Sequence, residues 1–312
     1  MKLKFIILVS AALIALPSFS QKKKNSKAES EASRIIEFSN SVIKMGNSNN
    51  EIFGTYQQLL QTADNNAERL SKNPNLQPFY VNCKGIPARA EQAAAYKTAL
   101  KSVQNFPEKA DIEKYVETGN NHMNSLSQWC ASISSYFADK QYQSDTDFAK
   151  YSSMRDSLIY YLDLSSANWR SASAQASAAG NRAELLLLEG SKIASFVIPM
   201  KTDLNSLDKI FGMFDSQQVD IQAVRSELEQ LTASIEKNKD TSTKDLSKLK
   251  DIYYKEVYQT FYRKCGEAAK ALQSLTERIE DASDADMLNR WFGSANSHYS
   301  EAVQKYNLFI SQ

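Results

Sequence analysis

The stretch from Ser144 to Val197 contains no proline, and it constrains the fold of this chain more than any other part of the sequence. As a single α-helix it would extend about 80 Å, because each residue adds about 1.5 Å along the axis. One element of a compact domain rarely reaches that length. The stretch therefore predicts either the spine of an elongated bundle or two helices that separate near Gly180 or Gly190.

Helix-breaking residues are scarce and are concentrated elsewhere. The 312-residue chain has nine glycines and six prolines, and four of the prolines lie between Pro74 and Pro107. No alternating run of β-branched residues bounded by turns is present. The sequence therefore predicts an all-α fold, an elongated multi-helix bundle with long antiparallel helices.

Apolar residues at helical spacing support this fold class. The clearest seam, with members three and four residues apart, is Ile112, Val116, Gly119, Met123, Leu126, Cys130, Ile133 and Phe137. Residues 46–50 favour a break in the first helical region, although they could be a polar patch on one long helix, and Asn238 to Thr243 predicts a loop. Asp145 or Thr146 is expected to cap the next helix. The Ala/Ser-rich stretch 165–179 predicts close approach of neighbouring helices.

The N-terminus has the features of a cleaved signal peptide. Two lysines precede an apolar run from Phe5 to Leu16, and Ser18 and Ser20 are small residues where signal peptidase cuts. The run is shorter than the about 20 residues that a membrane span needs. No cysteine lies near the cut to carry a lipid. We therefore expect residues 1–20 to be removed and the protein to be periplasmic or secreted, without a stable membrane anchor.

The rest of the chain is interpreted as a flexible basic tail (21–32) followed by one helical-bundle domain (33–312), with an optional subdivision near residue 199. The whole chain carries 37 basic and 36 acidic residues. This balance argues against nucleic acid as a partner, because binding to nucleic acid normally requires a strong basic excess.

Three cysteines, Cys83, Cys130 and Cys265, permit at most one internal disulfide. Cys83 falls in an irregular region, whereas Cys130 and Cys265 lie on or near apolar helix faces. We expect both helical cysteines to be small buried residues with free thiols, a common state of cysteine in protein cores. Whether any pair of the three forms a disulfide is left open.

The chain lacks the recognised motifs of catalytic and cofactor sites: the nucleophile elbow, the phosphate-binding loops and the paired histidines of zinc enzymes. Its two histidines, His122 and His298, are interpreted as surface or capping residues. A metal-dependent enzyme that uses either histidine is the weakest of three hypotheses. We expect no enzymatic activity, no catalytic residue, no cofactor and no protein-bound metal.

Aromatic residues are the compositional feature that most favours a binding role. Tyr254, Tyr258 and Tyr262, together with Phe261, lie three or four residues apart and so share one broad helix face. We favour a core lined by these rings, with hydroxyls reaching the surface. The sharper alternative is a groove for a peptide, glycan or apolar ligand, in which the three tyrosines bind the ligand.

The stretch from Gln141 to Leu162 resembles the most recognisable part of the YiiG-like domain of unknown function, in which a Tyr-rich helix end leads into an acidic turn and a long helix. The matching residues there are Tyr142, Asp145, Phe148, Ala149 and Lys150. Glu37 and Asn40 resemble a pair at the family's start. The resemblance extends from about Ser33 to the C-terminus. It implies an all-helical envelope protein, often a lipoprotein, with no catalytic residues to transfer.

These observations favour an exported, non-enzymatic helical envelope protein that acts as an interaction or structural module. Its expected partner is an unidentified envelope protein or cell-wall or glycan material. The alternative is a periplasmic binder of a small ligand, peptide or glycan, with an aromatic-lined pocket between helices at Tyr254, Tyr258 and Tyr262. The sequence identifies neither the partner nor the oligomeric state.

Overall fold

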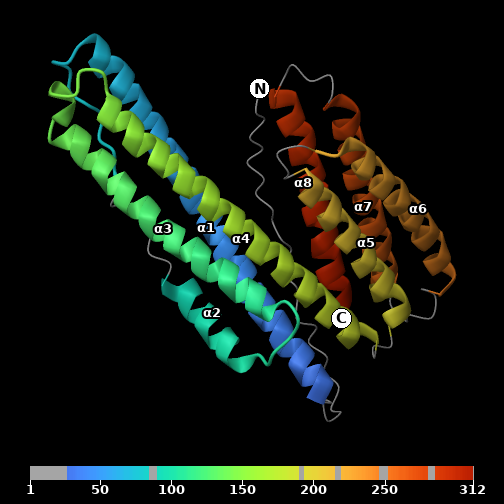
Figure 1. The fold of residues 1–312 in the computed structure, drawn as a ribbon. Coiled ribbons are helices and arrows are strands. Elements are labelled where there is room, and N and C mark those ends of the chain that lie inside the picture. Colours follow the sequence, from blue (N-terminus) through green and yellow to red (C-terminus); the bar gives the residue numbers. More distant parts are fainter. Residues whose placement is uncertain are drawn as a thin grey trace. The chain divides into compact units, whose positions relative to one another are not determined.

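The structure, a computed structural model, describes residues 27–83, 90–189, 193–214, 219–245, 252–279 and 285–311. These residues form eight α-helices and no strand, which confirms the predicted all-α multi-helix bundle (Figure 1). The helices are α1 (Lys27–Lys72), α2 (Ala90–Ser102), α3 (Lys109–Ala138), α4 (Ala149–Glu189), α5 (Ala194–Met213), α6 (Ile221–Asp245), α7 (Ile252–Arg278) and α8 (Ala285–Ile310), and the short 3-10 helix η2 (Gln141–Gln143) precedes α4.

The chain divides into two compact units, one of residues 37–180 and one of residues 181–312 together with residues 1–36. We call them the 37–180 unit and the 181–312 unit. The sequence predicts an optional subdivision near residue 199, and the division between these units falls at residue 180. Pro199 itself lies inside α5, within its first two turns. Proline removes one backbone hydrogen bond there without ending the helix.

In the 37–180 unit, α1, α3 and α4 lie side by side (Figure 1), and Trp169 of α4 sits between two glycines. Its side chain is 1% exposed. A Cβ atom on Gly119 of α3 would lie 2.8 Å from Nε1 of Trp169, and one on Gly46 of α1 would lie 2.4 Å from Oγ of Ser173. Ser165 also donates a hydrogen bond to the carbonyl of Gly119 at 3.0 Å. The Ala/Ser-rich part of α4 thus permits the close helix approach that the sequence predicts.

The predicted break at residues 46–50 is wrong, because α1 continues through it as one 46-residue helix. Gly46 faces the crowded side of α4 rather than a turn, and Asn49 is only 4% exposed. A polar and glycine-containing stretch can stay helical when neighbouring helices pack against it, because tertiary packing outweighs the small propensity penalties.

The start of α4 follows the prediction. Asp145 accepts hydrogen bonds from the backbone amides of Lys150 and Tyr151, at 3.2 and 3.4 Å, so it caps the helix. Of the two expected breaks, Gly180 lies within α4. Gly190 lies outside the described residues, and α4 ends next to it at Glu189.

The 181–312 unit has its own core, in which α7 and α8 pack along each other and α5 and α6 complete the set. Polar groups are buried in it as well. Lys201 and Glu184 form an ion pair at 2.8 Å with side chains only 6% and 0% exposed, and Tyr306 donates to Glu184 at 2.6 Å. Because each charge has a partner, this buried pair avoids the large penalty of an isolated buried ion.

Two other boundaries differ from expectation. The predicted loop at Asn238 to Thr243 is helical, since α6 runs to Asp245; the stretch contains neither glycine nor proline, and its residues disfavour helix only weakly. Part of the predicted flexible tail is also helical, because α1 begins at Lys27. The predicted signal peptide and the rest of the tail lie outside the described residues. Among the helices that the structure describes, none has the length and apolar content needed to cross a membrane.

Candidate functional site

In the last turns of α1, side chains on two different faces of the helix contact two surface features of the 37–180 unit. Asn66 and Arg69 face the irregular segment that follows the helix, residues 73–83. Asp64 and Glu68 lie on the other side and line a pocket between α1 and α4. We call these features the 73–83 segment and the α1/α4 pocket.

The 73–83 segment is fixed to the helices by polar contacts. The side chain of Asn66 donates to the carbonyl of Phe79 at 2.8 Å and accepts from the amide of Phe79 at 2.7 Å. Ser134 of α3 donates to the carbonyl of Val81 at 2.8 Å. The guanidinium carbon of Arg69 lies 4.0 Å from the centre of the Phe79 ring, a cation–π contact. The segment is therefore held at both its backbone and one of its rings.

A disulfide joins the end of this segment to α3, since Cys83 and Cys130 are bonded with their Cα atoms 5.8 Å apart. The expectation that Cys130 is a free buried thiol is thus wrong. Its position on the apolar seam of α3 is compatible with burial, at 1% exposed, and with bonding to a segment that packs there. Cys265 is the buried free cysteine that the sequence predicts, and burial raises the pKa of its thiol.

The fixed segment holds large apolar side chains in solvent. Leu76, Phe79 and Tyr80 are 37%, 52% and 72% exposed, whereas Val81 is buried. Exposed apolar side chains scattered singly need no explanation, but these three fall within five residues of one fixed backbone, and we take them as a candidate contact surface. The backbone of this segment is held in place before any partner arrives, so binding would cost little conformational entropy.

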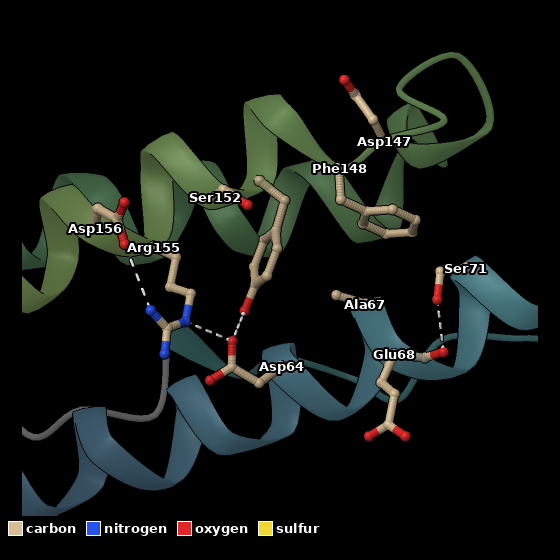
Figure 2. A pocket seen from close by; sticks show the side chains of 10 residues that line it. Asp64, Ala67, Glu68, Ser71, Asp147, Phe148, Ser152, Arg155 and Asp156 are labelled. Carbon is tan, nitrogen blue, oxygen red and sulfur yellow. Dashed lines mark hydrogen bonds and ion pairs between the residues drawn. The ribbon is translucent and has the colours of Figure 1, made fainter.

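The α1/α4 pocket has a volume of about 480 Å³ and is lined by polar and apolar side chains. Figure 2 shows Arg155 of α4 and Asp64 of α1 facing one another across it. Nε of Arg155 lies 2.7 Å from Oδ1 of Asp64, and the hydroxyl of Tyr151 donates to the same oxygen at 2.6 Å. Phe148, at the entry to α4, lines the pocket next to Asp147.

Hydrogen bonds between tyrosines and aspartates at and near the pocket shift the pKa values of these side chains. Burial, followed by the hydrogen bond to Asp64, raises the pKa of Tyr151. Burial and the hydrogen bond to Asp145 likewise raise the pKa of Tyr136. Burial acts to raise the pKa of Asp145, but hydrogen bonds from Tyr136 and from two backbone amides outweigh it and leave this pKa below its ordinary value. Near neutral pH the tyrosines are donors and Asp145 is an acceptor.

The carboxylates of the α1/α4 pocket already have partners within the protein. Asp64 binds Arg155 and Tyr151, Asp156 lies 3.4 Å from Arg155, and Asp147 accepts from the backbone amide of Ala149. Glu68 pairs with Lys72 at 2.7 Å. We therefore interpret these side chains as contacts that hold α1 against α4. The candidate functional surface is the 73–83 segment.

The three tyrosines singled out by the sequence lie in the 181–312 unit, within or against its core. Tyr258 and Tyr262 are 2% and 1% exposed, with ring centres 4.8 Å apart. Tyr254 packs its ring edge-to-face on Phe309 at 5.2 Å. The hydroxyl of Tyr258 donates to the carbonyl of Asn238 at 3.3 Å. The structure brings these rings together as core, and their role in binding a ligand stays a prediction.

A buried carboxylate lies beside these rings. Asp203 of α5 is 1% exposed and accepts hydrogen bonds from Ser234 at 2.5 Å and from Asn238 at 2.9 Å. Burial raises the pKa of Asp203, and these hydrogen bonds offset part of the rise. Burial also raises the pKa of Tyr262. Asp203 is therefore a buried carboxylate that has hydrogen-bond donors inside an apolar core.

Neither histidine belongs to the 73–83 segment or lines the α1/α4 pocket. His122 packs against the ring of Tyr161, with centres 5.8 Å apart. Nδ1 of His298 lies 3.1 Å from Glu267, and Lys264 bridges Glu267 and Glu301 at 2.9 and 3.0 Å. Within the described parts of the chain, no three His, Cys, Asp or Glu side chains are placed to hold a metal ion.

Sequence reasoning identified the irregular region but missed the contact residues in it. Phe79 and Tyr80 follow Pro74 and Pro78, which mark a loop, but the sequence holds no signal for the exposure of these two rings. The role of Asn66 had no signal either, because an asparagine in a helical stretch usually faces solvent.

Comparison with known proteins gives no match: no family model, no curated protein and no solved structure matches the chain. The resemblance to the YiiG-like domain therefore stays a prediction from residues 141–162 and the first helix.

Proposed function

We propose that the protein is an exported, non-enzymatic helical protein of the cell envelope that acts as an interaction or structural module through the 73–83 segment. The observation that carries the proposal is the exposure of Leu76, Phe79 and Tyr80 on a backbone fixed by Asn66 and a disulfide. Disulfides persist mainly in oxidising compartments. The bond between Cys83 and Cys130 therefore supports export, as does the signal-like N-terminus.

Retention on envelope material tests the contact surface. The purified protein is mixed with envelope fragments from its own cells, and the bound fraction is measured after sedimentation. We expect wild type and Tyr160→Ala to be retained, since Tyr160 is an exposed tyrosine elsewhere in the same unit. The double variant Phe79→Ala/Tyr80→Ala should be released. Equal retention of all three proteins would overturn the role of the segment.

Export is tested separately, by cell fractionation and N-terminal sequencing. The chain should be found outside the cytoplasm with Gln21 as its first residue. A cytoplasmic protein that retains Met1 would contradict the proposal. The non-enzymatic assignment is tested by a broad hydrolase screen on the same purified sample, in which turnover above that of a heat-inactivated control would contradict it.

A further inference from the structure

We infer that the 73–83 segment binds a neutral glycan, through the rings of Phe79 and Tyr80 and the amide side chains around them. The inference rests on the proposed function, because it names the chemical class that this contact surface recognises.

The size of the apolar surface favours a ligand over a protein partner. Phe79 and Tyr80 are 52% and 72% exposed, so with a full area of about 200 Å² per side chain the two rings offer roughly 250 Å². A stable protein interface takes about 800 Å² from each partner. The rings therefore provide only a small part of such an interface, whereas a single exposed ring is large enough to stack on one sugar ring.

The chemistry of the segment is uncharged. Residues 73–83 read NPNLQPFYVNC and contain no acidic or basic side chain. Of the two cations in the last turn of α1, Arg69 stacks on Phe79 and Lys72 pairs with Glu68. Within the segment, an anionic ligand such as a phosphate-rich polymer would find no positive charge to pair with. A neutral ligand needs no such partner, and its binding would bury no unpaired charge of the segment.

The polar groups that remain suit hydroxyl-rich ligands. Four amide side chains of the segment are exposed, those of Asn73, Asn75, Gln77 and Asn82, and among them Oδ1 of Asn73 accepts a hydrogen bond from the backbone amide of Asn75 at 3.1 Å. An amide both donates and accepts hydrogen bonds, and a sugar hydroxyl does the same. A sugar ring also has an apolar face of C–H groups that packs on an aromatic ring. Rings and amides on one short segment therefore match both surfaces of a neutral glycan.

The fixed backbone is the third supporting observation. Asn66 holds Phe79 through both of its backbone groups, and Ser134 and the disulfide hold the residues that follow. Individual contacts to a glycan are weak. A backbone that is already ordered loses little conformational entropy on binding, so more of the contact free energy contributes to affinity. Arg69 fixes one face of the Phe79 ring.

Titration calorimetry with defined oligosaccharides tests the inference. The probes are chitotriose, cellotriose and maltotriose, which are neutral, and a sulfated heparin hexasaccharide as the anionic comparison. We expect the full chain to bind at least one neutral trisaccharide with a dissociation constant of about 0.1–1 mM. The heparin fragment should not bind.

Variants locate the binding to the segment. Tyr80→Ala should weaken the binding about tenfold, which is the upper range for one aromatic contact. Tyr80→Trp should retain it, and Tyr160→Ala should equal wild type. Tyr80 is largely exposed, so its variants should keep the wild-type unfolding midpoint, which is measured on the same samples.

Three outcomes overturn the inference: no heat with any neutral trisaccharide at about ten times the expected dissociation constant, binding that Tyr80→Ala leaves unchanged, or preference for the sulfated probe. The proposed function fails separately. Envelope retention could depend on Phe79 and Tyr80 while an excess of the trisaccharides fails to compete. In that case the proposed contact surface is supported and the neutral glycan is rejected as its ligand. If retention is also independent of both rings, both proposals fall.

Discussion

Glycines in α1 and α3 have roles that depend on what each would touch if it carried a side chain. The hydrogen of Gly119 leaves room for the indole of Trp169, and that of Gly46 leaves room for Ser173. Gly54, in the same helix as Gly46, has open space instead. The same residue type therefore serves close packing at two positions and has no packing role at a third.

Alanine substitutions should separate these roles. Gly119→Ala places a methyl group 2.8 Å from a rigid buried indole, and we expect it to lower the free energy of unfolding by about 1–3 kcal/mol. Gly46→Ala meets a hydroxyl that can rotate, so its cost should be smaller. Gly54→Ala is the matched control and should stabilise by about 0.5–1 kcal/mol, because alanine favours helix. Urea unfolding of the three variants checks this order; equal stability of Gly119→Ala and Gly54→Ala would contradict it.

Two aspartates should respond to pH in opposite directions. The pKa of Asp203 is raised in the folded protein, chiefly by burial, above an unfolded value of about 3.9. In the window that starts near pH 4 and ends at the folded pKa, the native state holds the extra proton. Stability therefore falls as pH rises through that window. The pKa of Asp145 is lowered, so its stabilisation is present above about pH 4 and is lost as pH falls further.

Replacing each aspartate by asparagine should remove its contribution to the pH dependence of stability. Stability measured by urea unfolding from pH 3 to 7 should show a shallower decline above pH 4 in Asp203→Asn than in wild type. Asp145→Asn should lose less stability than wild type below pH 4. Each difference is bounded by about 1.4 kcal/mol per pH unit, the value for one proton. Identical pH profiles of wild type and both variants would contradict the assigned shifts.

At the scale of the element, the 73–83 segment is ordered by one side chain of the preceding helix more than by its own sequence. Asn66→Ala removes both hydrogen bonds to Phe79 and should cost about 1–2 kcal/mol. The loss should be local: hydrogen exchange at the Phe79 amide should accelerate, while amides in the middle of α1 keep their protection. Asn75→Ala, an exposed asparagine within the segment, serves as the control. Unchanged exchange at Phe79 would show that the disulfide and Ser134 suffice.

Helices were predictable from the sequence where one apolar face recurs, and their ends were not. The seam from Ile112 to Phe137 is confirmed as the buried face of α3, with Met123 only partly buried, because spacing alone determines which side chains share a face. The continuity of α1 through Gly46 was not predictable, since Gly46 packs against Ser173 and Trp169 of α4, which are more than a hundred residues away along the chain.

The contact surface was harder still to predict. Proline and asparagine marked the region after α1 as irregular, but Asn66 and Arg69 hold it through tertiary contacts that leave no local pattern. The disulfide could not be assigned for a similar reason. Three cysteines permit three pairings, and only the approach of the segment to α3 selects Cys83 with Cys130.

At the scale of the whole molecule, the disulfide stabilises one of two compact units. It closes a loop with a sequence separation of 47 residues inside the 37–180 unit. Chain-entropy arguments assign such a loop a stabilisation of about 4 kcal/mol. The 181–312 unit has a separate apolar core and includes no part of this loop.

Removing the disulfide should therefore destabilise the two units unequally. In the Cys83→Ser/Cys130→Ser variant, hydrogen exchange followed by mass spectrometry should show loss of protection in peptides of α3, with peptides of α7 close to wild type. Cys265→Ala should leave the 37–180 unit unchanged and serves as the control. Equal loss in α3 and α7 would mean that the chain unfolds as one cooperative block.

The order of the cysteines along the chain has a consequence for how the correct pair is reached. Polypeptides are made N-terminus first, and under the proposed export an N-terminal signal would also lead the chain into the oxidising compartment in that order. Cys83 and Cys130 would then arrive before Cys265, and catalysed oxidation can proceed in seconds. Cys265 then becomes fully buried in the other unit. Under the proposed export, arrival of the native pair first and burial of Cys265 afterwards would both disfavour incorrect pairing.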